Sequence, residues 1–323
     1  MNRTSIAVAA LSAIAALAAL PAAAQIYPNR AIRLVVPSSP GGGTDITGRI
    51  VANKLSEQLG QQVVVDNRAG AGTIIGIEIA AKAPPDGYTI LMGLSTLAIN
   101  PSMYTKLPYD AMKDLAPISL AVLSPNILTV HPSVPAKTVK EFIALAKARP
   151  GTITFGSAGQ ATSPHLSGEL LKVLAKIDIV HVPFKGSGQS VISSLAGEIA
   201  ANFPSVPTAI PYIKAGKLRG LGVTMAKRTA ALPEVPSIAE AGVPGYEATQ
   251  WFGVLAPAGT PRPIIDRLNA EIVKLLKSPN VRDRLIADGT DPAPTTPEEF
   301  GAYIKSETEK WTKVIKAAGI KPQ

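Results

Sequence analysis

The chain has 323 residues, of which 46% are hydrophobic and 17% are charged, enough for two globular domains of ordinary size or one large one. It contains no cysteine, which excludes disulfide bonds and lipid attachment to an N-terminal cysteine. The formal net charge is +9, but the lysines and arginines are scattered and aromatic residues make up only 5%, which argues against a nucleic-acid partner.

Residues 1–24 have the pattern of a secretory signal peptide. Arg3 supplies the positive charge, an apolar run extends from Ile6 to Leu20, and small residues lead up to Ala24. A membrane anchor is the alternative interpretation, but the run is short, and no later segment approaches the ~20 apolar residues of a spanning helix. We therefore expect export, cleavage after Ala24, and a periplasmic protein with no direct membrane anchor.

Strands and helices alternate along the rest of the chain. Apolar runs predict strands at 32–36, 63–65, 88–94, 153–155, 179–184, 198–203, 218–223 and 249–255. Periodicity and caps predict helices from 46 to Gly60, at 73–82, from the capping box at Thr138 to Pro150, from an N-cap at Ser163, at 263–276, at 281–287, and from a second capping box at Thr296. This alternation predicts mostly parallel sheets, covered by helices on both faces, with ligand sites at the carboxyl ends of strands.

Two glycine loops lie at such strand ends in the first part of the chain. Gly41 to Gly43 are followed by Thr44 and Asp45 at a helix start, with neither the Gly-Lys-Ser/Thr of a Walker loop nor the spacing of a dinucleotide loop. We favour anion binding on backbone N–H groups there. The loop at 67–76 comes closer to the dinucleotide pattern, but its third glycine is one place late. We interpret it as a tight turn with close packing.

Two further loops combine small residues, hydroxyl groups and helix starts. In residues 155–166, Ser157, Thr162 and Ser163 are suited to holding a carboxylate near the positive end of a helix. His165 lies in the first turn of that helix, where an ordinary packed histidine is the alternative interpretation. In residues 181–190, Lys185 either adds charge to the site or is simply a solvated lysine.

Catalytic and metal-binding patterns find little support. The three histidines, His131, His165 and His181, are not spaced as metal ligands, and there is no G-x-S-x-G motif. A pair formed by Ser157 or Ser163 with His165 has no identifiable third member. We expect no metal and no cofactor, and keep a secreted hydrolase as the alternative to a binding protein.

Several stretches of the mature chain resemble the substrate-binding proteins of tripartite tricarboxylate transporters, also called Bug receptors. The motifs extend from Tyr27 to the C-terminus and include YPNRAIRLVVP, PGGGTD, VVVDNRAGAG, PDGYTILMG, HVPFKGSG and WFGVLAPAGTP. The resemblance implies an α/β, type II periplasmic binding protein fold, with two lobes hinged around a ligand cleft. Lobe 1 would comprise residues 26–125 plus 248–323, and lobe 2 residues 126–247.

The resemblance also implies ligand-binding residues by position. Gly42, Gly43 and Asp45 would come from the first lobe, and Ser95 would line the cleft after a strand. The second lobe would contribute the segment from Ser157 to His165, which includes Gly159, Thr162 and Ser163, together with Pro204 and Ser205.

Three departures from the family pattern bear on the ligand. Ala161 stands where glycine is usual, Phe184 replaces a tyrosine, and Pro204-Ser205 replace an aspartate that can meet an amino group in relatives. We therefore hypothesise a ligand without an ammonium group, namely a dicarboxylate, a tricarboxylate or an aromatic acid.

The predicted function is that of an extracytoplasmic solute receptor. It would capture a small organic carboxylate and deliver it to the permease subunits of a tripartite tricarboxylate transporter, without catalysis or ATP hydrolysis by this chain. A ligand sensor that docks on a signalling partner is a further alternative.

Overall fold

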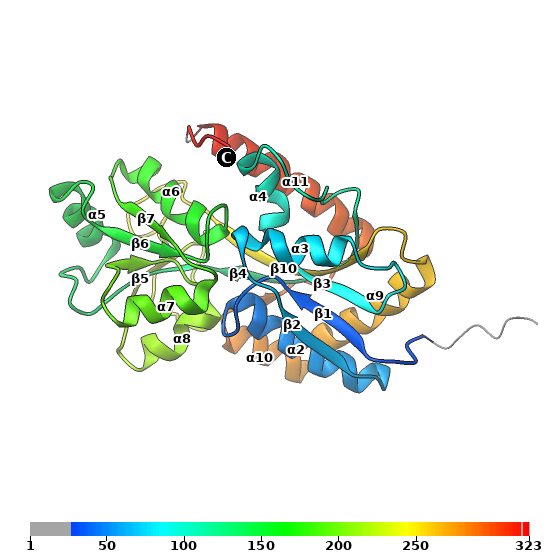
Figure 1. Ribbon diagram of the computed structural model, residues 1–323. Coiled ribbons are helices and arrows are strands. Elements are labelled where there is room, and N and C mark those ends of the chain that lie inside the picture. Colours follow the sequence, from blue (N-terminus) through cyan, green and yellow to red (C-terminus); the bar gives the residue numbers. More distant parts are fainter. Residues whose placement is uncertain (1–26, 318, 323) are drawn as a thin grey trace, which may run out of the picture.

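The computed structural model describes residues 27–317 and 319–322, and the predicted signal peptide at 1–24 lies outside the described residues. The described chain folds into two α/β units, each built on one sheet (Figure 1). None of the described helices is long and apolar enough to cross a membrane.

The sheet of the first unit has the strand order β11-β4-β10-β3-β1-β2. Its strands are β1 (Ile32–Val36), β2 (Val63–Asn67), β3 (Thr89–Leu94), β4 (Leu115–Pro125), β10 (Thr249–Pro257) and β11 (Asp291–Pro292). Its helices are α2 (Gly43–Leu59), the short 3-10 helix η1 (Ala71–Thr73), α3 (Ile74–Ala81), α4 (Thr96–Met103), α9 (Arg262–Lys277), α10 (Pro279–Ala287) and α11 (Pro297–Ala317).

The sheet of the second unit has the order β7-β6-β8-β5-β9. Its strands are β5 (Ile127–Val130), β6 (Thr154–Ser157), β7 (Val180–Pro183), β8 (Ala201–Asn202) and β9 (Arg219–Val223). Its helices are α5 (Val139–Ala148), α6 (Ser163–Ala175), α7 (Ser187–Leu195) and α8 (Val206–Lys214).

The prediction of mostly parallel sheets is wrong, because both sheets are mixed. In the first sheet β1 is parallel to β2 and β3, but β10 is antiparallel to β3 and β4. In the second sheet β5 is antiparallel to both β8 and β9. The cause is topological: β4 leads directly into β5 of the other unit, and β10 begins where the chain returns, so these strands oppose their neighbours.

The chain crosses between the units twice, and the two crossings are paired. β4 ends at Pro125 and β5 begins at Ile127, so a single residue, Asn126, separates strands of different sheets. On the return, Thr249 pairs with Pro125 and Gln250 with Ser124. The two units are therefore joined by neighbouring hydrogen-bonded strands (Figure 1).

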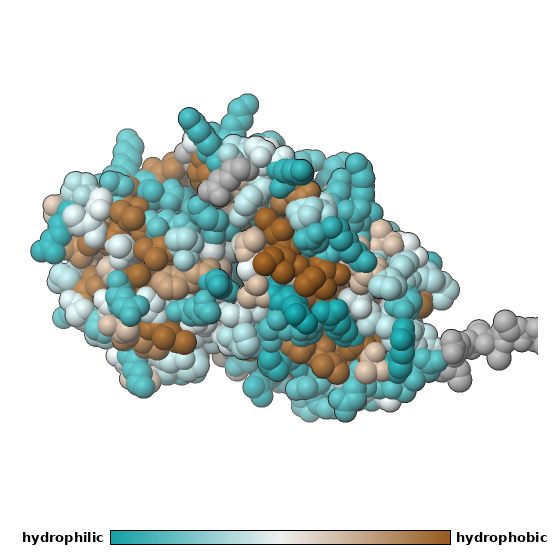
Figure 2. Space-filling model, viewed as in Figure 1, coloured by the Kyte–Doolittle hydropathy of each residue, from teal (hydrophilic) through white to brown (hydrophobic). Residues whose placement is uncertain are grey.

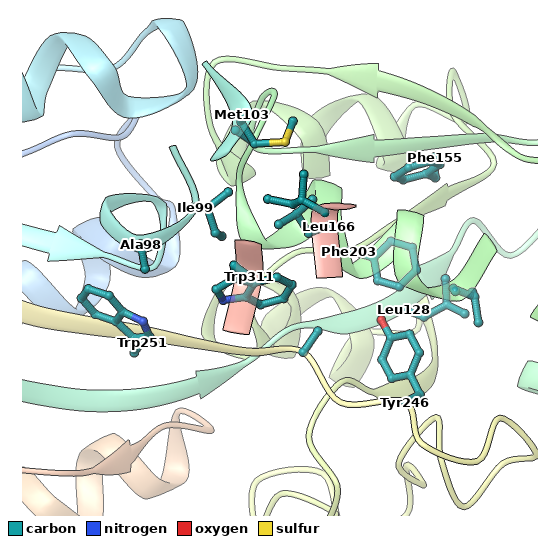
Figure 3. Close-up of a cluster of buried hydrophobic side chains, with 14 of the residues drawn as sticks. Ala98, Ile99, Met103, Leu128, Phe155, Leu166, Phe203, Tyr246, Trp251 and Trp311 are labelled. Carbon is teal, nitrogen blue, oxygen red and sulfur yellow. The ribbon is translucent and has the colours of Figure 1, made fainter. Parts of the chain in front are cut away.

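Buried apolar residues hold helices on both faces of each sheet. One cluster includes Trp251 and Trp311 of the first unit and continues to Phe155 and Phe203 of the second (Figure 3). A second cluster packs α2, α9 and α10 under the first sheet, opposite α3, α4 and α11 (Figure 1). Figure 2 shows apolar atoms at the surface over α3, set among hydrophilic ones.

The helices predicted from 46 and 281 begin earlier, at Gly43 and Pro279. The predicted helix caps are confirmed, with one shift. The Thr296 and Glu299 side chains form a reciprocal capping box, with hydrogen bonds of 2.9 and 3.2 Å. Thr138 accepts the Glu141 N–H at 3.1 Å. Ser163, predicted as an N-cap, is instead the first residue of α6, and Thr162 is the N-cap. The cap moves because Thr162 has extended backbone angles, whereas Ser163 is already helical.

Candidate functional site

A small closed cavity lies where the two units meet. The space open to the centres of water-sized spheres is about 60 Å³. The first unit lines it with Pro37, Ser38, Gly42, Gly43, Thr44, Gly70, Ala71, Gly72, Thr73, Leu94 and Gln250, and the second with Ala158, Thr162, Phe184, Lys185, Gly186, Ser187 and Ser205. The wall is thus made mainly of loops and helix starts from both units.

Four helix N-termini converge on this cavity. The N-caps of α2, α6, α7 and α8 are Gly42, Thr162, Gly186 and Ser205, and each of them lines it. None of these caps accepts a hydrogen bond from a backbone N–H of its own helix through its side chain. Helix N-termini carry partial positive charge and N–H groups without intrahelical partners. The cavity is therefore suited to an anion.

The side chains around the cavity reinforce this electrostatic character. Among its lining residues, all of which belong to the described part of the chain, Lys185 is the one with a charged side chain, and none is acidic. The hydroxyl groups of Thr44 and Ser205 supply further hydrogen-bonding groups. A carboxylate would thus find donors but no opposing negative charge.

The two units approach one another closely through backbone. A Cβ placed on Gly186 would lie 3.0 Å from Ser39 Cβ, and one on Gly72 would lie 2.5 Å from the Gln160 carbonyl oxygen. Gly186 also has a φ of +148°, a region that favours glycine. Glycine at these positions lets the walls of the cavity meet with no side chain between them.

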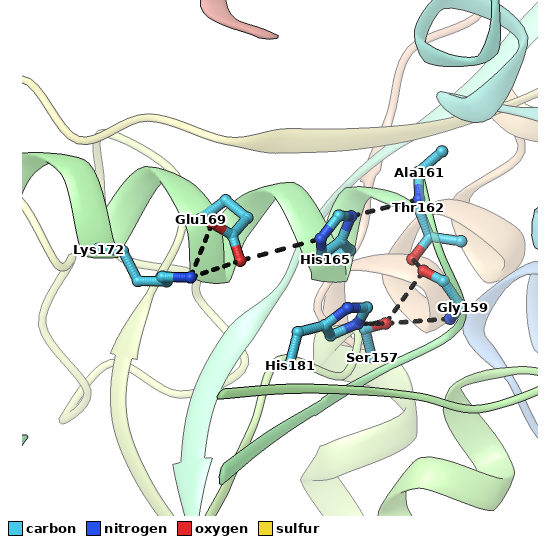
Figure 4. Close-up of polar contacts among 8 residues, drawn as sticks. All are labelled: Ser157, Gly159, Ala161, Thr162, His165, Glu169, Lys172 and His181. Atoms are coloured by element: carbon cyan, nitrogen blue, oxygen red, sulfur yellow. Dashed lines mark hydrogen bonds and ion pairs between the residues drawn. The ribbon is translucent and has the colours of Figure 1, made fainter. Parts of the chain in front are cut away.

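Polar groups behind the second-unit wall fix the loop that follows β6 (Figure 4). Ser157 Oγ accepts the Gly159 N–H at 3.0 Å and lies 2.6 Å from His181 Nε2. Thr162 Oγ1 donates to the Gly159 carbonyl at 2.6 Å. Ser157 is fully buried. Its hydroxyl therefore holds the loop in place and does not face the cavity.

Two stacked imidazoles support the same loop. The rings of His165 and His181 lie 4.0 Å apart, and His165 Nδ1 accepts the Ala161 N–H at 3.2 Å. Burial, followed by the charge of Lys172, lowers the pKa of His165 to about 4. Burial, followed by the charges of His165 and Lys172, lowers the pKa of His181 to about 3. Both rings are neutral at physiological pH, which keeps Nδ1 of His165 free to accept.

Asp45, predicted for the site, holds the first glycine loop from within its own unit. Its carboxylate accepts the Gly41 N–H at 2.9 Å, the Arg49 Nε–H at 3.0 Å and the Asn67 amide at 3.0 Å. Burial opposes ionisation, but these hydrogen bonds outweigh it and lower the pKa of Asp45. Asp45 is therefore an ionised positioning residue that does not line the cavity.

The sequence matches a known family of receptors. A family profile described as "Tripartite tricarboxylate transporter family receptor" matches residues 47–320. The chain belongs to this receptor family.

Individual relatives agree with the family assignment. The receptor is 38% identical to protein BugT of Bordetella pertussis over 303 residues, covering 93% of each chain. It is similar to the solved structure of R. palustris Rpa4515 with adipate, at 37% identity and a TM-score of 0.90, over 92% of this chain and 100% of the other. MatC of Rhodopseudomonas palustris, solved with bound malate, gives 29% identity and a TM-score of 0.83, over 90% and 100%. The fold of the receptor is that of the Bug-type periplasmic binding proteins.

The structure brings part of the predicted site together. Gly42, Gly43, Thr162 and Ser205 line the closed cavity, and Gly159 lines an open groove next to it. The cavity wall does not include Asp45, Ser95, Ser157, Ser163, His165 or Pro204. Ser163 Oγ, for example, accepts from the Asn126 side chain at 2.9 Å, and Ser95 is fully buried.

Other lining residues of the receptor were not predicted. Gly70 to Thr73 belong to the loop interpreted as a tight turn with close packing, yet they form part of the cavity wall. The near-dinucleotide spacing of their glycines was the available signal. Gln250 comes from a crossing strand, and its sequence neighbourhood carries no signal of ligand binding.

Proposed function

We propose that this receptor captures a small organic carboxylate in the periplasm and delivers it to the permease of a tripartite tricarboxylate-type transporter. The observation that carries the proposal is the convergence of four helix N-termini on one cavity whose lining contains no acidic residue. Backbone N–H groups and hydroxyls compensate the loss of hydration when a carboxylate is buried. The adipate and malate named with two similar structures support a carboxylate.

The proposed mechanism is closure of two lobes around the ligand. Lobe 1 would be residues 26–125 plus 248–323 and lobe 2 residues 126–247, joined by the paired strands at Pro125 and Thr249. Lobe 1 supplies one of the four helix starts, that of α2, and lobe 2 supplies those of α6, α7 and α8. Closure of the lobes would bring α2 to the other three. Residues 1–24 would direct export and be removed.

We further propose that the ligand has no ammonium group. An amino-acid ligand places a cation in the cavity, and burial of that cation without an anionic partner is costly. The lining residues contain no aspartate or glutamate, and Pro204 and Ser205 follow Phe203 where an acid is found in relatives. A dicarboxylate, tricarboxylate or aromatic acid fits this lining.

A Ser/His hydrolase is less well supported. Ser157 contacts His181 and not His165, and both Ser157 and Ser163 are fully buried and hydrogen-bonded within the protein. A nucleophile must reach the substrate, and neither hydroxyl lines the cavity.

Thermal unfolding with a panel of acids tests the proposed function. The protein is refolded first to remove carried-over ligand, and the panel contains mono-, di- and tricarboxylates, aromatic acids, aspartate, glutamate and sugars. A ligand at ~100 times its Kd stabilises the folded state by about 2.7 kcal/mol, a shift of several degrees in Tm. We expect a shift with one class of acid and recovery of that acid unaltered. Chemical conversion of the acid, or stabilisation by sugars alone, contradicts the proposal, and tight binding of aspartate contradicts the absence of an ammonium group.

A further inference from the structure

The closed cavity is small beside the space next to it. The space open to the centres of water-sized spheres is about 60 Å³ in the cavity and about 660 Å³ in the groove that adjoins it. A dicarboxylate that places one carboxylate among the helix starts can therefore extend its other end out of the closed space.

An open groove continues from the cavity. It measures about 660 Å³ and shares four lining residues with the closed space, namely Ala71, Gly72, Phe184 and Lys185. The rest of its wall is Tyr104, Gly159, Gln160, Pro183 and Gln189, with no acidic side chain. The groove thus provides room for the second end of a ligand, with Lys185 at the boundary between the two spaces.

Lys185 is held by its backbone and has a free ammonium group. The Lys185 N–H donates to Gln189 Oε1 at 3.2 Å, and the next residue, Gly186, is the N-cap of α7. Within the described residues the Lys185 ammonium has no ion pair or side-chain hydrogen bond, and the residue is exposed. A lysine side chain is a flexible point charge, suited to an anionic group whose position varies.

We propose that Lys185 binds the distal carboxylate of a two-headed acid whose first carboxylate lies in the closed cavity. This inference rests on the proposed carboxylate-binding function and deepens it. The cavity would select the first head strictly, because backbone donors surround it. The groove would tolerate different chain lengths, because Lys185 can follow the second head.

The test compares adipate with hexanoate, which lacks the second carboxylate, by calorimetry on the wild-type protein and on Lys185→Gln. We expect the wild type to bind adipate more tightly than hexanoate. In Lys185→Gln we expect adipate affinity to fall by about three- to fivefold, in the range of an exposed ion pair, while hexanoate affinity changes by less than about twofold. Lys185→Arg keeps the charge and should retain the preference.

A matched control distinguishes direct contact with the ligand from the general effect of removing one positive charge. Lys147 is exposed on α5 of the same unit, so Lys147→Gln removes the same charge away from the groove. We expect this control to bind both acids as the wild type does. Equal loss of both acids in Lys185→Gln, no loss of either, or equal loss of adipate in Lys147→Gln overturns the role of Lys185.

The outcomes also distinguish the two proposals. If the wild type binds hexanoate as tightly as adipate, the distal site fails while carboxylate capture stands. If the wild type binds no acid of the panel, both fail. Thermal unfolding of each variant without ligand confirms that the exposed substitutions leave the fold intact.

Discussion

Gly43 at the start of α2 lies directly against Ser205, the N-cap of α8 in the other unit. A Cβ on Gly43 would lie 2.9 Å from Ser205 Cβ and closer still to its Oγ. The two residues bring the positive ends of two helices together across the cavity. This close approach of the two helix starts therefore depends on the absence of a side chain at residue 43.

Gly43→Ala should prevent full closure and weaken carboxylate binding by about tenfold or more, because the added methyl group overlaps Ser205. Unfolding without ligand should change little, since residue 43 begins a helix where alanine is well tolerated. Calorimetry with the tightest acid of the panel measures the affinity. Adding Ser205→Gly should restore part of it. Gly301→Ala, on α11 with ordinary contact distances, is the matched control. Wild-type affinity in Gly43→Ala would disprove this closure contact.

Asn126, the single residue between β4 and β5, should contribute to stability through its buried amide. Its Nδ2 donates to Ser163 Oγ at 2.9 Å and to Ser167 Oγ at 3.2 Å. Asn126→Ala removes both bonds and should lower the free energy of unfolding by about 1–3 kcal/mol. Urea denaturation measures this change. Asn280→Ala, at an exposed position, should stay within about 0.5 kcal/mol of the wild type. A similar effect in both variants would show that the Asn126 contacts contribute little.

Ser157→Ala should weaken ligand binding, and it should leave any ester hydrolysis by the protein unchanged. The hydroxyl fixes Gly159 and contacts His181, and the loop it supports carries Ala158 and Thr162 into the cavity. Loss of buried hydrogen bonds worth about 1–2 kcal/mol corresponds to a loss of roughly five- to thirtyfold in affinity. Ser193→Ala, which removes a hydroxyl bonded to Glu198 on α7, is the control. Hydrolysis of an ester panel by the wild type that disappears in Ser157→Ala would contradict this role.

The buried histidine pair predicts a loss of stability in mild acid. His165 and His181 have folded-state pKa values of about 4 and about 3, below the ordinary 6.5. As pH falls below 6.5, the two histidines bind protons in the unfolded chain but stay neutral in the folded state. The free energy of unfolding therefore falls. The slope is of order 1 kcal/mol per pH unit for each histidine, and it flattens below the folded-state pKa values.

Denaturant titrations between pH 7 and pH 4.5 measure this slope above the range where most carboxyl groups titrate. His165→Gln and His181→Gln should each reduce the slope relative to the wild type. An unchanged slope in both variants would show that other groups set the acid sensitivity of the fold.

The part of the site that sequence predicts well is the part made by local backbone. A strand end, glycines and a helix start are neighbours in the chain, so Gly42, Gly43 and Thr162 are found from their own surroundings. The direction of a side chain is harder to predict from sequence, because successive residues of a helix point about 100° apart. Asp45 and His165 are therefore close in sequence to lining residues, yet their side chains turn back into their own units.

Pairing between strands that are far apart in the chain is the other feature that the sequence does not predict. β4 contains Pro117 and Pro125 and was not predicted as a strand, although it is the longest one described. Pro117 is accommodated beside Leu255, where the β4–β10 register shifts. Gln250 reaches the cavity only because β10 pairs with β4 at the crossing, a contact between residues far apart in the chain. No local pattern contains that information.

The paired crossing strands have a consequence for whatever protein reads this receptor. Under the proposed closure, the paired crossings at Pro125 and Thr249 would act as one hinge, because hydrogen bonds hold the two strands together. Ligands of different length would then drive the same rotation and end in the same closed arrangement. The receptor would present its partner with a yes-or-no signal of occupancy, and the identity of the cargo would remain hidden inside.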